Sequence, residues 1–165
     1  MKDLRCDLIM MMRFGCGVIG WVRPAFDVRA GATVTAFRII ATMNFTRLTA
    51  LAQETVAATQ ARLPEAVRLP AAAVPVHLAA GPDEALLNEG FEPDILGLFT
   101  GPAHGDARGE DNLLPPQIHL YLENLWDFAE GDPRVFCDEV RLTYLHELGH
   151  YLGWDEDDLA ARGLD

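Results

Sequence analysis

The chain has 165 residues, with 13 lysine and arginine residues against 25 aspartate and glutamate residues, for a formal net charge of −12. Half of its residues are hydrophobic, which is enough for one domain with an apolar core and excludes an intrinsically disordered chain. The excess of acid argues against a nucleic-acid-binding protein, because phosphate backbones require a basic surface. No apolar run reaches the roughly 18 residues of a membrane span. The odd number of cysteines indicates no disulfide framework and a reducing, cytoplasmic location.

The first 42 residues differ in character from the rest. They carry a net charge of +3, whereas residues 43–165 carry −15. Glycines and a proline interrupt every run, so neither helical nor strand periodicity persists. Three interpretations stay open: a secretory signal, in which Arg13 breaks the apolar stretch, an appendage packed on the domain, or an upstream extension ending at Met43. A regular helical pattern begins directly after Met43, so we expect 1–42 to be an atypical extension outside the folded domain, and 43–165 to form that domain.

Helical spacing of apolar residues predicts a first helix over residues 45–63, with Asn44 as its N-cap and Pro64 and Pro70 ending it. Short strands are predicted at 74–79, 95–100 and 118–122, with one helical turn at 83–87. Pro75 means that the strand at 74–79 is either an edge strand or begins at that proline. The segment 101–116 is rich in Gly, Pro, Asp and Asn and predicts a long loop, a kind of segment that is often functional.

A second long helix is predicted from Asp132-Pro133, an N-cap followed by a proline in the first helical position, to about Leu152. Gly153 is its expected stop, and residues 155–162 fit a short closing helix. This order of elements predicts an α+β domain, with a small mostly antiparallel or mixed sheet and helices packed on one of its faces.

The chemistry is concentrated in the sequence LHELGHYLG, residues 145–153. His146 and His150 are four residues apart on a helix, so their imidazoles share one face and can reach one ion. Zinc accepts neutral imidazole and prefers tetrahedral sites. Glu147 lies beside the pair, where it can flank the metal without binding it. His-Glu-x-x-His is expected by chance in about 1% of chains of this composition, and the alternative is a solvated helix face.

This motif predicts a zinc-dependent peptide hydrolase that uses a metal-bound water activated by Glu147. Zinc can lower the pKa of water from ~15.7 to ~7. Glu147 would take the water's proton and pass it to the leaving amine, while the metal polarises the scissile carbonyl. A catalytic helix near the C-terminus of a zincin-like domain is the corresponding fold expectation.

Two histidines need a third protein ligand. Fifteen residues follow His150 in the sequence, too few for the separate downstream helix that carries a glutamate ligand in one large zincin class. The metzincin pattern HExxHxxGxxH matches as far as Gly153, but Glu156 stands at the third-ligand position and no methionine follows Met43. A positive φ at Gly153 would turn the chain back toward the metal, so Glu156 is the first choice.

The acids after Gly153 leave that third ligand open. Asp157 is the second choice, and Asp155 is a further alternative. All of these acids could instead form the first turn of the last helix, where negative charge suits the helix dipole. Both arrangements can hold together, with one acid on the metal and the others capping.

From Met43 onward the chain resembles the minimal zincin family of small bacterial metallopeptidase-like proteins. The resemblance lies in the opening helix, the strand ILGLF (95–99) before a Gly-rich loop, the strand 116–122, and HELGHYLG followed by acids and Leu159. The family pattern is HExxHxxG with an acid, usually aspartate, three residues after the glycine. It implies zinc ligands at His146, His150 and Glu156, with Glu147 as base. Glutamate at position 156 departs from the pattern by one methylene.

Further residues have weaker indications of a role. Glu139 lies seven residues before His146 and could hydrogen-bond a ligand imidazole, or be solvated. His119 and Tyr121 share one strand face and could stabilise an oxyanion, or be half-exposed sheet residues. His104 lies in the long loop and could reach the cleft, or be a surface histidine. Cys137 fits a small core residue.

We expect the partner to be a short or unfolded peptide, because so small a sheet leaves room only for a shallow cleft, and we expect no nucleic acid and no membrane. The acidic surface would disfavour acidic peptides. The alternative is a non-catalytic metal-binding or interaction protein that retains the HExxH motif, and a third hypothesis is a hydrolase of another amide. Iron, cobalt or manganese could fill the same ligands as zinc.

Overall fold

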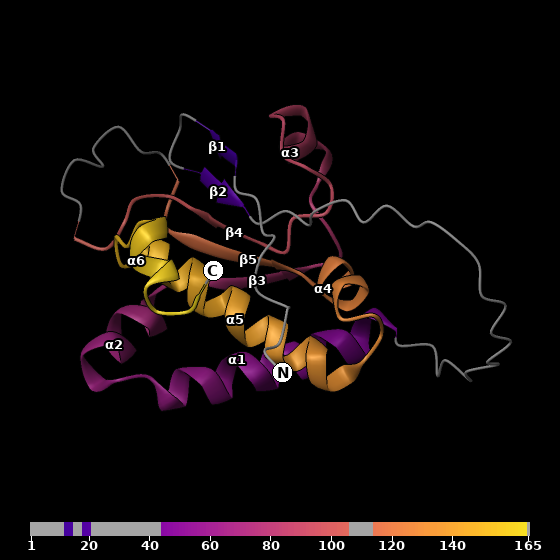
Figure 1. The fold of residues 1–165 in the computed structure, drawn as a ribbon, viewed down its shortest axis with the longest axis horizontal. Coiled ribbons are helices and arrows are strands. Elements are labelled where there is room, and N and C mark those ends of the chain that lie inside the picture. The colour runs from indigo at the N-terminus through magenta and orange to yellow at the C-terminus, as the bar shows by residue number, and fades with distance from the viewer. Residues whose placement is uncertain (1–11, 15–17, 21–43, 106–113, 165) are drawn as a thin grey trace, which may run out of the picture.

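A mixed β-sheet forms the layer on which the candidate site is built (Figure 1). The computed structural model describes residues 12–14, 18–20, 44–105 and 114–164. Within them the strand order is β1-β2-β4-β5-β3, with bounds β1 (Met12–Phe14), β2 (Val18–Gly20), β3 (Val76–Ala79), β4 (Gly97–Thr100) and β5 (Gln117–Tyr121). All neighbouring strands are antiparallel except β3 and β5, which run parallel.

Helices cover one face of this sheet. Figure 1 shows α1, α2 and α5 beneath the strands and the short α3 on the opposite side. The bounds are α1 (Phe45–Arg62), α2 (Glu65–Ala73), α3 (Glu84–Asn88), α4 (Leu122–Phe128), α5 (Pro133–Tyr151) and α6 (Glu156–Ala160). The expected α+β class, with a small mixed sheet and helices on one face, is therefore confirmed.

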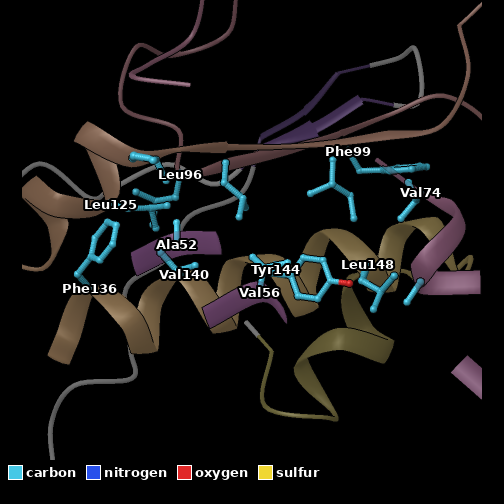
Figure 2. Close-up of a cluster of buried hydrophobic side chains, with 14 of the residues drawn as sticks. Ala52, Val56, Val74, Leu96, Phe99, Leu125, Phe136, Val140, Tyr144 and Leu148 are labelled. Atoms are coloured by element: carbon cyan, nitrogen blue, oxygen red, sulfur yellow. The ribbon is translucent and has the colours of Figure 1, made fainter. Parts of the chain in front are cut away.

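The main hydrophobic core lies between the sheet and the helix pair α1 and α5 (Figure 2). From the sheet, Phe99 points toward the helices, and Val140, Tyr144 and Leu148 follow one another along the buried face of α5. Their spacing is that of one helix face. A hydrogen bond from the Gln60 side chain of α1 to the Tyr144 hydroxyl (3.0 Å) ties the two helices together.

Most predicted elements are found near their expected positions, with two exceptions. Asn44 caps α1 and Asp132 caps α5, as expected. The expectation that Pro70 ends a helix is wrong, since Pro70 lies inside α2, whose Ala71 is fully buried in the core. Helix α4 is absent from the expected elements; it begins directly after β5 and buries Leu122 and Leu125. In both cases tertiary burial outweighs a local signal.

The expected extension, 1–42, lies almost entirely outside the described residues, and its boundary with the domain at 43 stays a prediction. The two described segments in it pair with the sheet through Ile19 opposite Phe99 and Gly20 opposite Leu98. Among the helices of the described ranges, none combines the length and the apolar character that a bilayer crossing requires. Cys137 is a half-buried free thiol that packs against the main core.

Candidate metal centre

Helix α5 carries both histidines of the motif, and local sequence explains its bounds. The Asp132 side chain accepts hydrogen bonds from the backbone N–H groups of Arg134 (2.8 Å) and Val135 (3.3 Å), and Pro133 occupies the first turn. The helix ends where Gly153 adopts φ +84°. His146, Glu147 and His150 all lie in its buried C-terminal half, with exposed fractions of 1%, 0% and 5%.

Three ligand atoms converge at the C-terminal end of α5. The Nε2 atoms of His146 and His150 are 2.7 Å apart, and Nε2 of His150 is 3.3 Å from Oε1 of Glu156. One ligand atom from each residue lies within 4.8 Å of the others. Two imidazoles and a carboxylate make up a donor set that zinc accepts.

The protonation of the two rings explains why this cluster fits a cation. Nδ1 of His146 lies 2.7 Å from the carbonyl oxygen of Leu164, and Nδ1 of His150 lies 3.2 Å from that of Trp154. A carbonyl only accepts, so each Nδ1 must donate. In a neutral ring the Nε2 atom is then an acceptor, and two such acceptors face a carboxylate. A cation satisfies all three atoms.

Protonating one ring instead would require an imidazolium in a buried site. Burial lowers the pKa of His146 to about 3, with a smaller lowering from His150 and an opposing effect of the Leu164 carbonyl. Burial also lowers the pKa of His150, opposed by the Trp154 carbonyl. Both rings are therefore neutral near pH 7, which is the state that binds metal.

Two glycine turns supply the carbonyls that hold these rings. After Gly153, the Trp154 N–H bonds the Gly149 carbonyl and the Gly153 N–H bonds that of His150. After Gly163, at φ +67°, the Leu164 N–H bonds the Leu159 carbonyl in the same pattern. Both are Schellman motifs. In each, the residue that follows the glycine presents its carbonyl to one histidine, so the glycine turns orient both imidazoles.

Glu147 lies beside the cluster, in contact with strand β4. A Cβ atom built at Gly97 would stand 2.8 Å from Oε1 of Glu147, so the carboxylate occupies space that a side chain on β4 would fill. Neither carboxylate oxygen has a hydrogen bond of ordinary length and angle among the described residues. Burial raises the pKa of Glu147 well above its usual value, against an opposing effect of the Phe99 backbone, and Glu156 raises it further. A raised pKa suits a proton carrier.

The acids after Gly153 occupy different places. The Asp155 side chain accepts a hydrogen bond from the Asp158 N–H (2.9 Å) and caps α6. Asp157 is exposed. Glu156 is the acid whose carboxylate reaches the histidines, with one third of its side chain exposed. The structure therefore brings together the residues chosen from the motif, His146, His150 and Glu156, and gives Asp155 a capping role.

His119 and Tyr121 belong to the other face of the sheet. Tyr121 packs with Ile95 and Leu98 in a second, smaller cluster. The His119 ring stacks on His77 of the neighbouring strand, with ring centroids 5.1 Å apart. The packing of His119 thus gives no support to an oxyanion-stabilising role, whereas Tyr121 is near enough to the candidate site that, after burial and Asp83, the Glu147 charge also raises its pKa.

His104 and Glu139 take up other positions. The His104 N–H donates to the Tyr151 carbonyl (2.6 Å), and its Nδ1 lies 3.1 Å from the Tyr151 hydroxyl. These contacts fix the start of the long loop against the end of α5. Glu139 is half-buried, and burial together with Asp138 raises its pKa. The hydrogen bonds that orient the histidines come instead from the backbone of Trp154 and Leu164.

Sequence reasoning found the turn at Gly153 but missed those two carbonyls, the second turn at Gly163 and the close contacts at Gly97 and Gly149. Backbone acceptors leave no trace in residue type, although glycines at 153 and 163, ten residues apart and flanking a short helix, were a usable signal for two turns. A glycine inside a strand, as at Gly97, indicates the close approach of another group. A glycine inside a helix can indicate a close approach in the same way, and Gly149 in α5 lies against Leu159 and Trp154.

Comparison with known proteins agrees with this geometry. The family model of zincin-like metallopeptidases matches residues 71–164, more than half of the chain. The chain belongs to this family. The match covers the strands β3, β4 and β5 and the whole candidate site, and it begins after α1. The comparison with curated proteins finds no match.

Proposed function

We propose that the protein is a zinc-dependent peptide hydrolase in which His146, His150 and Glu156 hold the metal and Glu147 is the general base. The family match and the His-His-Glu cluster support a zincin-type metalloprotein. The observation that carries the proposal is the convergence of three acceptor atoms beside a buried carboxylate that is not one of them. A cytoplasmic location is part of the proposal.

In this proposal a zinc ion held by His146, His150 and Glu156 would supply Lewis acidity, to acidify water and to polarise a peptide carbonyl. The residues of the chain do the rest. The Leu164 and Trp154 carbonyls hold both Nδ1–H groups, which leaves the Nε2 atoms as the ring atoms that would bind a metal ion. Glu147 accepts a proton at a carboxylate oxygen and delivers it to the leaving amine, a transfer that its raised pKa favours.

The proposed substrates are short or unfolded peptides. Within the described part of the chain there is one small sheet, and the start of the long loop between β4 and β5 is anchored to α5 through His104. We propose that such a domain provides only a shallow cleft. The net charge of −12 disfavours acidic peptides by like-charge repulsion.

The test is a comparison of the wild-type protein with Glu147→Gln, both loaded with zinc. Glutamine keeps the size of the side chain and cannot carry the proton. The expected result is unchanged zinc content and a loss of peptide hydrolysis of at least about 100-fold, the usual contribution of a general base. Equal hydrolysis by the two proteins on a mixed peptide library would remove Glu147 from the reaction.

A non-catalytic metal-binding protein is the second candidate, and one observation favours it. Glu147 is fully buried, so a substrate reaches it only if β4 and α5 leave access from the side of the metal. If the wild-type protein binds zinc tightly but cleaves no member of the library, this second function holds.

A further inference from the structure

The segment after Gly153 contributes to the site at three points. It supplies the Glu156 carboxylate, the Trp154 carbonyl for His150 and the Leu164 carbonyl for His146. We call residues 153–164 the closing segment. Its only helix, α6, has five residues, which is too short to hold its position without packing. The position of the closing segment on α5 therefore decides whether the three contributions meet.

The closing segment packs closely on α5 at Gly149. A Cβ atom built there would stand 2.4 Å from Cδ2 of Leu159 and 3.0 Å from Cε3 of Trp154. Leu159 is fully buried. Any residue other than glycine at position 149 would carry a Cβ atom that overlaps Leu159 and crowds Trp154. These two side chains could then not lie as close to α5 as they do.

Leu159 and Trp154 are each connected to the candidate metal site through a few covalent bonds or one hydrogen bond. Leu159 lies three residues after Glu156, on the neighbouring turn of α6, and its carbonyl accepts the N–H of Leu164. Trp154 carries the carbonyl that holds His150. Displacing Leu159 and Trp154 from Gly149 therefore shifts all three contributions together.

Apart from these contacts and the hydrogen bonds to α5, the packing around the closing segment is incomplete. A cavity of about 170 Å³ lies between the closing segment, α5 and the junction of α1 and α2, and Gly149, Trp154 and Leu164 are in its lining. Within the segment, the Arg162 guanidinium lies 4.3 Å from the centre of the Trp154 ring and pairs with Asp158 at 3.0 Å. These contacts stiffen the segment internally but do not fix it on α5.

We infer that Gly149 is a positioning residue for the metal site: the absence of a side chain there lets Leu159 and Trp154 seat the closing segment, and with it Glu156 and the two carbonyls, on the ligand helix. The inference rests on the proposed role of His146, His150 and Glu156 as metal ligands. It distinguishes Gly149 from an ordinary helical glycine, whose replacement by alanine stabilises a helix.

The experiment measures zinc affinity, by competition with a chromophoric chelator, in Gly149→Ala, Leu159→Val and the double variant. Gly149→Ala should bind zinc at least about 10-fold more weakly, the lower end of the cost of disturbing groups that orient metal ligands. Leu159→Val removes the δ-methyl that the new Cβ would meet. The double variant should therefore recover most of the lost affinity. Gly81→Ala is the matched control, since its nearest neighbour is 4.0 Å away, and it should bind as the wild type does.

A second readout does not depend on metal. In the metal-free protein, the Nδ1–H protons of His146 and His150 should give two slowly exchanging NMR signals, because both are hydrogen-bonded to carbonyls. Gly149→Ala should lose them and the double variant should regain them. If the signals respond in this way but the wild type binds no zinc, Gly149 still positions the closing segment, but the proposed function fails and with it the role of Gly149 toward a metal ion.

The inference is overturned if Gly149→Ala binds zinc and retains both signals like the wild type. It is equally overturned if the double variant recovers neither. If Gly149→Ala alone does not fold, the double variant decides: recovery of folding and of zinc binding supports the inference, and continued failure contradicts it.

Discussion

At the residue scale, the absence of a side chain at Gly97 leaves room for the side chains of Thr143 and Glu147 against β4. A Cβ there would stand 2.5 Å from Cγ2 of Thr143 and 2.8 Å from Oε1 of Glu147. The first contact concerns the packing of β4 on α5, and the second concerns the proposed general base. Because they involve different atoms, they can be separated by mutation.

We expect Gly97→Ala to be destabilised, by about 1–3 kcal/mol as is typical of overpacking. Adding Thr143→Ser removes the methyl group of Thr143 and should restore most of the stability. The double variant should still bind zinc but hydrolyse peptides more slowly, since the methyl group added at position 97 continues to displace the Glu147 carboxylate. Thermal melts, zinc content and kcat measure the three effects. Full activity in the double variant would show that the position of Glu147 is not sensitive to this contact.

His119, on the other face of the sheet, should make the stability of the fold depend on pH in the acid range. Burial lowers its pKa, the stacked His77 lowers it further, and Asp83 opposes both. The folded state therefore binds fewer protons than the unfolded state below about pH 6.5, the ordinary value for histidine. The stability that neutral His119 contributes is present above pH 6.5 and is lost as the pH falls.

Accordingly, His119→Gln should reduce the loss of unfolding free energy between pH 7 and pH 5 relative to the wild type. Urea melts at a series of pH values measure this slope, and His77→Gln should reduce it by a smaller amount. Identical slopes in the wild type and His119→Gln would contradict the assignment.

At the scale of elements, the two Schellman turns connect α6 to His146 and His150, the histidines of the candidate site. Gly153 and Gly163 have φ of +84° and +67°, and a Cβ at either would meet nothing within 4 Å. Alanine at these positions therefore strains the backbone without a steric clash, at a cost of roughly 1–2 kcal/mol.

Each substitution should weaken zinc binding, since each misplaces one of the two carbonyls. Gly90→Ala is the matched control: its φ is +96°, it also has open space around the Cβ position, and it follows α3, on the opposite side of the sheet (Figure 1). It should lower stability to a similar extent and leave zinc affinity unchanged. Equal zinc affinity in all three variants would mean that the turns serve stability alone.

The elements also show how much the sequence could predict. Caps and periodicity located α1 and α5 because Asn44 and Asp132 act within one turn of chain. The helical character of Pro70 and of Leu122–Phe128 depended on core contacts with distant residues, which one sequence does not reveal. The motif located His146, Glu147 and His150, and spacing selected Glu156. The carbonyls of Trp154 and Leu164 could not be found, because every residue carries one.

On the scale of the whole molecule, the core and the site are largely separate. The main core lies between the sheet and the helices α1 and α5 (Figure 2), and its packing does not require a metal ion. We therefore expect the protein to keep its fold without zinc, with only the closing segment loosened.

Treatment with a chelator should preserve far-UV circular dichroism and lower the Tm. Zinc at 1,000 times its Kd adds about 4 kcal/mol to stability, which corresponds to roughly 8–16 °C for a domain of this size. Unfolding on chelation would instead indicate a structural ion and would favour the non-catalytic alternative.

The central claim is that His146, His150 and Glu156 hold one metal ion. The most direct test is the zinc content per chain of the full-length protein, set against those of His150→Ala and Glu156→Ala after the same exposure to zinc and the same desalting. The account predicts one zinc per chain in the wild type, almost none in His150→Ala, and a reduced content in Glu156→Ala. A wild-type protein without zinc, or a His150→Ala variant that retains a full equivalent, would contradict it.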